Sequence, residues 1–216
     1  HNPFHDNGIK VFDGDGYKLT DDFEHEIEKI VLADQNSPSD SFTRETGSAI
    51  QLLDASRCYK EFLKSCLAEP SVFQGMKIVM DCSNGATHQI APELFSELGA
   101  EVTALSICPN GKNINADCGS EYPQALIAQV KKRKADIGLA FDGDGDRLIA
   151  VDETAQVISG DRILAICARD LKSKGQLKNN LAVSTVMSNL GLHLALKNMG
   201  IKHVMSRVGV LYVLEE

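Results

Sequence analysis

Residues 77–107 read KIVMDCSNGATHQIAPELFSELGAEVTALSI and alternate between two hydrophobic patterns. The apolar runs at 77–81 and 101–107 are short, which predicts two strands. Between them, residues 87–98 have helical spacing and end at Gly99, which predicts a helix. This strand–helix–strand order is typical of neighbouring parallel strands joined by a helix that covers one face of the sheet.

The same alternation continues toward the C-terminus. A helix is predicted at 122–134 and a third strand at 137–141, and the resulting βαβαβ order favours a mostly parallel sheet with helices on both faces. The pattern then restarts, with a helix, a strand, a helix and a strand predicted in turn at 159–173, 180–186, 188–199 and 202–208. We therefore expect a multi-domain α/β fold of repeated mixed, mostly parallel sheets flanked by helices.

The N-terminal part of the chain has a different organisation. Residues 9–19 predict a hairpin whose connection is Asp13-Gly14-Asp15-Gly16. Thr20, followed by acidic residues, predicts the start of a helix. The polar stretch 34–48 is typical of a surface loop or linker, and a second helix is predicted at 49–67.

The sequence DGDGDR at 142–147 directly follows the third strand of the βαβαβ unit. In an extended backbone, alternate side chains point the same way, so we expect Asp142, Asp144 and Asp146 to converge. Three converging carboxylates repel one another unless a cation lies between them, and carboxylate oxygens suit Mg²⁺. The guanidinium of Arg147 suits a phosphate, and ligands of open α/β sheets bind where strands end. The loop therefore predicts a metal-and-phosphate site.

Three alternatives for this loop also follow from the residues. One is a solvated turn, the character of Asp13-Gly14-Asp15-Gly16, which lacks a third aspartate and an arginine. Another is an EF-hand calcium loop, but that loop needs glycine where Arg147 stands and helices where the flanks are β-like. The third is a phosphatase with an aspartyl nucleophile, whose signature would be hydrolysis of phosphate esters without a serine.

Composition limits the classes of protein that this chain can represent. Its 216 residues are 43% hydrophobic, enough to bury a core in one large or two smaller domains. The formal net charge of −8 argues against a general nucleic-acid binder, and no apolar stretch has the length needed to span a bilayer. The six cysteines form no C-x-x-C pair, which is typical of the reducing cytosol, so we expect a cytoplasmic protein.

Four segments give the chain a resemblance to the α-D-phosphohexomutase family that covers essentially its whole length. They are His1-Asn2-Pro3-Phe4-His5-Asp6-Asn7-Gly8-Ile9-Lys10, Asp142 to Arg147, Asp81-Cys82-Ser83-Asn84-Gly85-Ala86 with Asn113 to Gly119, and Val186 to Leu192. The first is similar to the end of the family's catalytic-serine motif, and the second to its metal loop. Segments one, three and four favour the branch of the family that acts on glucosamine phosphates.

The resemblance implies an activity and a division into domains. Residues 1–60 would be the C-terminal part of a first domain, 61–157 a second domain with the metal loop, and 158–216 the N-terminal part of a third. The implied activity is an intramolecular phosphotransferase that interconverts glucosamine 6-phosphate and glucosamine 1-phosphate through a phosphoserine and a bisphosphate intermediate. The alternatives are a phosphoglucomutase or phosphomannomutase, or an inactive Mg²⁺-binding fragment.

The resemblance also implies roles for individual residues. The matched metal ligands are Asp142, Asp144 and Asp146, with Mg²⁺ as the cofactor. Arg147 matches the residue that steadies the phosphoryl group, and His1 and Lys10 match acid/base or phosphate-contacting positions. The expected partner is a hexosamine phosphate substrate, with no nucleic acid and no membrane, and a homodimer is left open.

Two departures from the family pattern stand out. The catalytic serine would immediately precede His1, so the chain as given is expected to be inactive alone. The second departure is Val210-Leu211, which stands where the family usually has an Asp-Arg pair.

Overall fold

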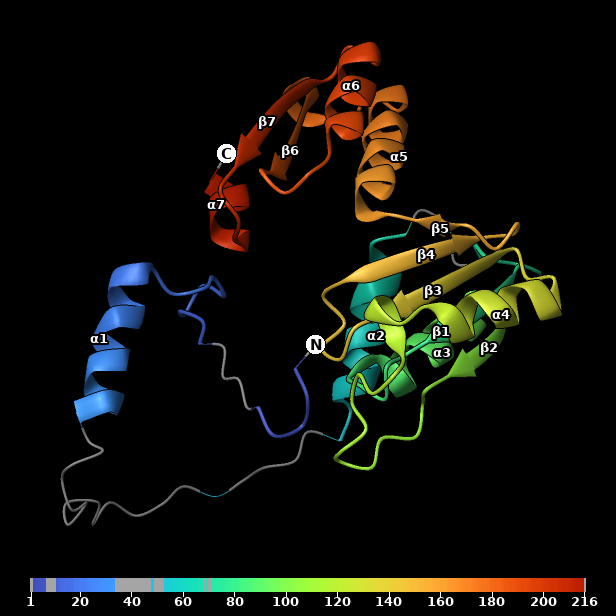
Figure 1. Cartoon of the computed structure of the whole chain (residues 1–216), viewed down its shortest axis with the longest axis horizontal. Coiled ribbons are helices and arrows are strands. Elements are labelled where there is room, and N and C mark those ends of the chain that lie inside the picture. Colours follow the sequence, from blue (N-terminus) through green and yellow to red (C-terminus); the bar gives the residue numbers. More distant parts are fainter. Residues whose placement is uncertain are drawn as a thin grey trace. The chain divides into compact units, whose positions relative to one another are not determined.

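The computed structural model describes residues 2–6, 11–33, 48, 53–67, 69 and 71–215. The chain divides into two compact units, one formed by Asn7–Ala55 and the other by His1–Asp6 with Ser56–Glu216. Figure 1 shows the elements of both units. Each unit is described by itself below.

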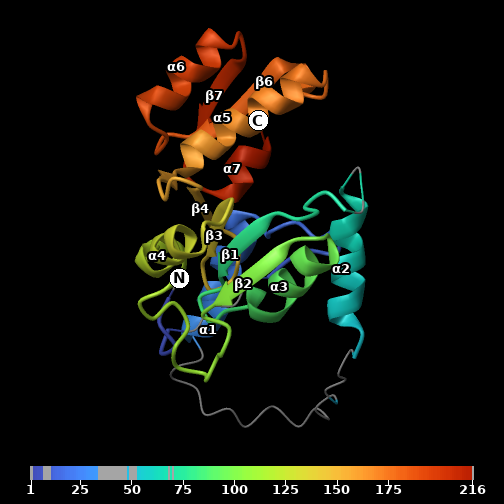
Figure 2. The ribbon, with the colours of Figure 1, turned by 90° about the vertical axis from the view of Figure 1, so that its right-hand side faces the viewer.

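A five-stranded sheet forms the centre of residues 71–158, in the order β2-β1-β3-β4-β5. Strand β1 pairs in parallel with both β2 and β3, whereas β4 runs antiparallel to β3 and to β5. The expected mixed α/β sheet is therefore confirmed, with two parallel and two antiparallel pairings; strands β2, β1, β3 and β4 can be followed in Figure 2. The strands are β1 (Lys77–Asp81), β2 (Glu101–Leu105), β3 (Ile137–Phe141), β4 (Leu148–Asp152) and β5 (Val157–Ile158).

Two helices cover the two faces of this sheet, as the alternation of strands and helices predicted. Helix α3 (Thr87–Glu97) packs Ala91 against Ile78 and Met80. Helix α4 (Gln124–Arg133) packs on the opposite face, where it belongs to the same buried cluster as Val79. Successive residues of β1 therefore serve opposite cores, and this central strand is buried on both faces.

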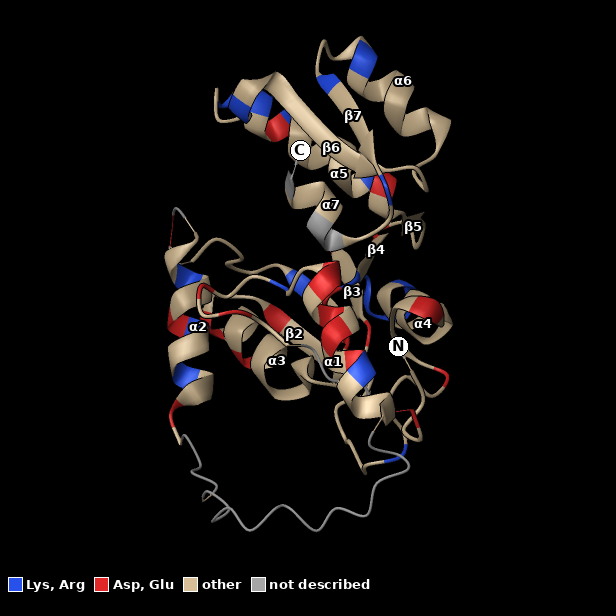
Figure 3. Ribbon diagram, turned by 90° about the vertical axis from the view of Figure 1, so that its left-hand side faces the viewer, with Lys and Arg blue, Asp and Glu red and all other residues tan. Residues whose placement is uncertain are grey.

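Helix α2 (Ala55–Ser65) is held to α3 by ion pairs. The Nζ atom of Lys60 lies 3.0 Å from a carboxylate oxygen of Glu93 and 2.6 Å from one of Glu97. Figure 3 shows charges of both signs on α2. The predicted helix at 49–67 is confirmed over Ala55–Ser65; residues 53–54 form a turn before it, and residues 49–52 lie outside the described part of the chain.

The second set of alternating elements also forms as predicted, within a residue or two at the ends. Parallel strands β6 (Leu181–Thr185) and β7 (Lys202–Ser206) make a two-stranded sheet. Helices α5 (Gly160–Ser173) and α6 (Leu190–Asn198) share a buried cluster of Ala168, Leu192 and Leu196, which Ile201 joins from just before β7. A short helix α7 (Val210–Glu215) follows β7. Short 3-10 turns precede β6, at Lys178–Asn180, and α4, at Gly119–Glu121.

The N-terminal unit contains helix α1 (Asp21–Ala33) and a tight turn before it. An antiparallel bridge joins Phe12 to Lys18, so the predicted hairpin is confirmed over the described residues 12–18. Oδ1 of Asp13 accepts hydrogen bonds from the backbone N–H groups of Asp15 and Tyr17, at 3.0 and 2.9 Å. This Asp-Gly pair therefore closes its own turn. The predicted linker lies outside the described residues except for Ser48.

None of the helices in the described ranges combines the length and the apolar character that a bilayer crossing requires.

Candidate metal and phosphate site

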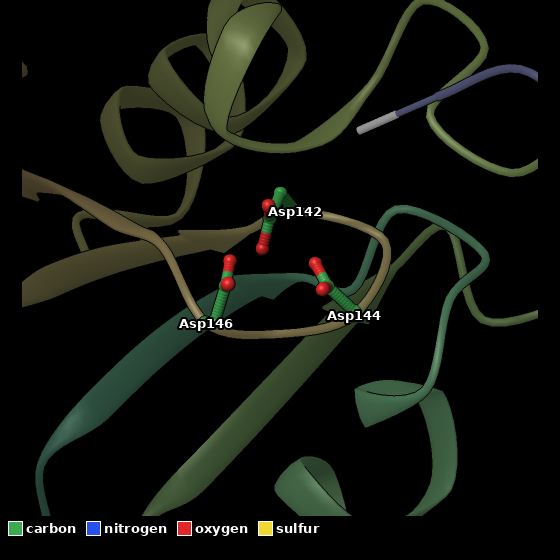
Figure 4. Close-up of side chains that lie close together, drawn as sticks. All are labelled: Asp142, Asp144 and Asp146. Carbon is green, nitrogen blue, oxygen red and sulfur yellow. The ribbon is translucent and has the colours of Figure 1, made fainter. Parts of the chain in front are cut away.

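The acidic loop connects β3 to β4 at the carboxyl end of the parallel strands. One carboxylate oxygen from each of Asp142, Asp144 and Asp146 lies within 4.8 Å of the others. Figure 4 shows the three side chains pointing toward one another from this loop. The sequence prediction that they converge is confirmed.

The sequence analysis expected the convergence to come from an extended backbone, and this reason was wrong, because the loop is bent. Strand β4 returns antiparallel beside β3, so the chain must reverse between Phe141 and Leu148. The backbone N–H of Gly145 donates to the carbonyl oxygen of Asp142 over 3.1 Å, and Gly145 has φ = +78°. That left-handed conformation is one that glycine adopts readily. The carboxylates meet because they line the inside of this reversal.

Asp142 differs from its two neighbours in its surroundings. Its side chain is 1% exposed, whereas that of Asp146 is 54% exposed. Its Oδ1 atom accepts hydrogen bonds from the backbone N–H groups of Gly145 and Arg147, each at 3.1 Å. Burial raises the pKa of Asp142, and the nearby charges of Asp146 and Asp144 raise it further. A cation bound here would relieve this repulsion.

The Arg147 side chain lies on the acidic loop itself. Its Nε atom is 3.5 Å from Oδ2 of Asp142 and 3.8 Å from Oδ1 of Asp146. The side chain is 51% exposed, so the guanidinium is accessible to a ligand while it lies beside the carboxylates. Asp152, at the end of β4, is engaged elsewhere, because its Oδ1 accepts from Thr154 and Gln156 in the next turn.

A neighbouring turn, which the sequence analysis used for the family resemblance and to which it gave no role at the metal loop, holds this loop. The turn is formed by residues 82–86, directly after β1. The backbone N–H of Ala86 donates to the carbonyl oxygen of Gly143 over 2.8 Å, and the hydroxyl of Ser83 donates to the carbonyl oxygen of Phe141. The strand–helix–strand pattern could have predicted this contact, because loops that follow adjacent parallel strands leave the sheet at the same edge.

Not every predicted site residue can be placed. His1 and Lys10 lie outside the described residues, so their roles stay predictions. Three histidines elsewhere in the described chain lie within hydrogen-bonding distance of other groups of the fold. Nδ1 of His88 lies 2.9 Å from the carbonyl oxygen of Gly85, and Nδ1 of His193 lies 3.2 Å from Nδ1 of His203. Among the described residues, the only cluster of three or more metal-type ligands is the acidic loop.

The residues present fit a hard divalent cation. The cluster offers three carboxylate oxygens and no sulfur or imidazole, and the buried Asp142 charge is costly without a counter-charge. One guanidinium beside three carboxylates leaves the loop with an excess of negative charge. A cation would balance that excess and leave Arg147 available to a phosphate.

The chain matches the phosphoglucomutase/phosphomannomutase family in all three of its α/β/α domains. Domain I matches at residues 1–38, domain II at 58–156 and domain III at 159–216. The chain therefore belongs to this family of α-D-phosphohexomutases. The acidic loop lies within the domain II match.

The curated proteins to which the chain is similar include several phosphoglucosamine mutases. It is 52% identical to that of Syntrophus aciditrophicus (strain SB) over 216 residues, which are 100% of this chain and 48% of the relative. It is 50% identical over 188 residues to that of Pelobacter propionicus, covering 87% of this chain and 42% of that protein. The chain thus spans about half the length of the curated relatives that it matches.

A solved structure supports the same family. It is a phosphoglucomutase/phosphomannomutase family protein from Burkholderia thailandensis, with 28% sequence identity and a TM-score of 0.69. The alignment covers 90% of this chain and 40% of the solved chain.

Proposed function

We propose that the protein containing this chain interconverts glucosamine 6-phosphate and glucosamine 1-phosphate by intramolecular phosphoryl transfer. The observation that carries the proposal is the convergence of three carboxylates with an arginine beside them at the carboxyl edge of a parallel sheet. The choice of sugar follows the similar curated proteins, which are phosphoglucosamine mutases 52% and 50% identical to this chain. The proposed route passes through a phosphoserine enzyme and a bisphosphate intermediate.

The chain's own residues supply positioning and charge. In this proposal Asp142, Asp144 and Asp146 hold Mg²⁺, which when bound stabilises negative charge on the transferring phosphoryl oxygens. Arg147 donates N–H groups to those oxygens and orients the phosphoryl group. The buried Asp142 is fixed by two backbone N–H groups, so the centre of the site is rigid before any ligand arrives. His1 and Lys10 remain proposed acid/base or phosphate-contacting groups.

The remaining assignments are proposals of the same kind. We assign residues 1–60, 61–157 and 158–216 to the end of a first domain, a second domain and the start of a third. The proposed partner is a hexosamine phosphate substrate, and we propose no nucleic-acid or membrane partner. We propose a cytoplasmic location, and a homodimer is left open.

A coupled assay on the full-length protein that contains this chain tests the function. Glucosamine 6-phosphate should be converted with a higher kcat/KM than glucose or mannose phosphates, and only with Mg²⁺ present. Intact-mass analysis should show one added phosphate on a serine. A clear preference for glucose or mannose phosphates would replace the amino-sugar assignment with a phosphoglucomutase or phosphomannomutase. Hydrolysis of phosphate esters without a phosphoserine would point to the aspartyl phosphatase alternative.

A further inference from the structure

The turn after β1 lies against the acidic loop because of the sheet order. Strands β1 and β3 are parallel neighbours, with Asp81 paired to Ala140, so the residues that follow them leave the sheet together. The backbone of Gly85 approaches that of Gly143 so closely that a Cβ atom on Gly85 would overlap the Gly143 carbonyl oxygen. Turn and loop therefore meet backbone to backbone.

This turn donates two hydrogen bonds to the loop, one on each side of Asp142. The Ser83 hydroxyl donates to the carbonyl of Phe141, the residue before Asp142. The Ala86 N–H donates to the carbonyl of Gly143, the residue after it. The Phe141 carbonyl belongs to the peptide that carries the Asp142 N–H, and the Gly143 carbonyl belongs to the peptide that carries the Asp144 N–H. Holding both limits how the backbone between these two aspartates can rotate. The carboxylate itself accepts from the N–H groups of Gly145 and Arg147, which lie further along the same loop.

Ser83 is itself held in an uncommon conformation. Its φ is +55°, a left-handed value that costs energy for a residue with a side chain. Its N–H donates to Oδ1 of the buried Asp81 over 3.1 Å, and its carbonyl accepts from the N–H of Asn115 over 2.9 Å. A Cβ atom on Gly119 would overlap both the Ser83 hydroxyl and the Phe141 carbonyl oxygen, so the Gly119 backbone lies directly against this hydrogen bond. The hydroxyl therefore has little freedom to aim anywhere except at the loop.

We infer that Ser83 is a positioning residue for the metal, acting through Asp142 without touching the ion. The inference rests on the proposed metal site. Groups that orient a metal ligand typically change metal affinity about ten-fold to a hundred-fold when they are removed. Ser83 satisfies that description because it is fully buried and bonded to the peptide that carries Asp142.

The test measures binding of Mn²⁺, which accepts the same oxygen ligands as Mg²⁺, to the whole chain by electron paramagnetic resonance. Ser83→Ala removes only the hydroxyl, and Ser83→Gly also relieves the positive φ, so at least one of them should fold. Both should raise the Kd for Mn²⁺ about ten-fold or more. Ser184→Ala is the matched control, because it removes another buried serine hydroxyl, from β6, and should leave the Kd unchanged.

The melting temperature of the metal-free variants separates positioning from a merely structural role. A lower melting temperature with an unchanged Kd in either Ser83 variant would overturn the inference while the metal site stands. A wild-type chain that binds no Mn²⁺ would overturn the metal site and the inference together.

Discussion

The backbone N–H of Ala86 donates a hydrogen bond to the carbonyl oxygen of Gly143 over 2.8 Å. This contact joins two loops that are almost sixty residues apart in the sequence and adjacent in space, because each follows a neighbouring parallel strand. The acidic loop is therefore not an independent turn. Its shape depends on a second segment that carries no ligand of its own.

Gly85→Ala should destabilise the chain, since the added Cβ would overlap the Gly143 carbonyl and backbone must move. Overpacking of this kind costs about 1–3 kcal/mol, measured as the change in the free energy of unfolding in urea. Gly160→Ala is the control, because Gly160 has open space around its Cβ position and should tolerate alanine. Equal stability of the two variants would contradict the close approach.

Asp142→Asn should lower the affinity for Mg²⁺ by more than about ten-fold, because it removes a charged ligand at the buried centre of the cluster. Asp15→Asn provides a matched control in the other Asp-Gly pair, where Asp13 closes its own turn. Isothermal titration calorimetry measures both. If Asp15→Asn lost Mg²⁺ binding while Asp142→Asn kept it, the ion would bind the N-terminal Asp-Gly turn, and the proposed site would be contradicted.

The stability of the C-terminal elements should fall in mild acid because of His203. Burial, and next the neighbouring His193, lower the pKa of His203 below its ordinary value of 6.5. The unfolded chain therefore takes up the proton first as the pH falls. The stability that neutral His203 contributes is therefore fully present above pH 6.5. It is lost as the pH falls through the lower pKa of His203 in the folded chain.

Hydrogen exchange of the β6 and β7 amides between about pH 7.5 and 5.5 measures this effect. Protection should decrease toward the acid end once the intrinsic exchange rate is corrected for. His203→Gln keeps a group that can bond to the Ser184 hydroxyl but cannot titrate, so it should flatten the profile. An identical pH profile in His203→Gln and the wild type would assign the effect to another group.

Alkylation should divide the six cysteines into two classes. Burial raises the pKa of the Cys82 thiol to about 11, and burial also raises that of Cys118. Because the thiolate is the reactive form, both should resist iodoacetamide near neutral pH. The exposed thiols of Cys58, Cys66, Cys108 and Cys167 should react, as read by peptide mass spectrometry. Rapid labelling of Cys82 in the folded chain would contradict the burial of this residue directly after β1.

Local pattern was enough to predict most of the fold. The apolar runs of β1 and β3 and the helical spacing of α3 depend on neighbours within a few residues, which a sequence displays directly. Boundaries shifted by a residue or two at β2 and α6, because helix and strand ends depend on contacts outside the segment. The antiparallel strand β5 was not predicted, since two residues carry too little periodicity.

The candidate site was predicted in its residues and not in its geometry. Asp142, Asp144, Asp146 and Arg147 are adjacent in sequence, so their proximity was assured by chain connectivity. The bend at Gly145 and the burial of Asp142 were not foreseen, because both arise from the reversal into β4 and from packing against the turn at 82–86.

By itself the sequence determined the alternation of strands and helices, the acidic loop and the family resemblance, since these depend on residue types at short spacing. Only the tertiary structure decided that Asp142 is buried while Asp146 is exposed, and that Ser83 and Ala86 hold the loop around it. The physical reason is that burial and backbone contact across parallel strands depend on which segments become neighbours in the sheet. No short window of sequence contains that information.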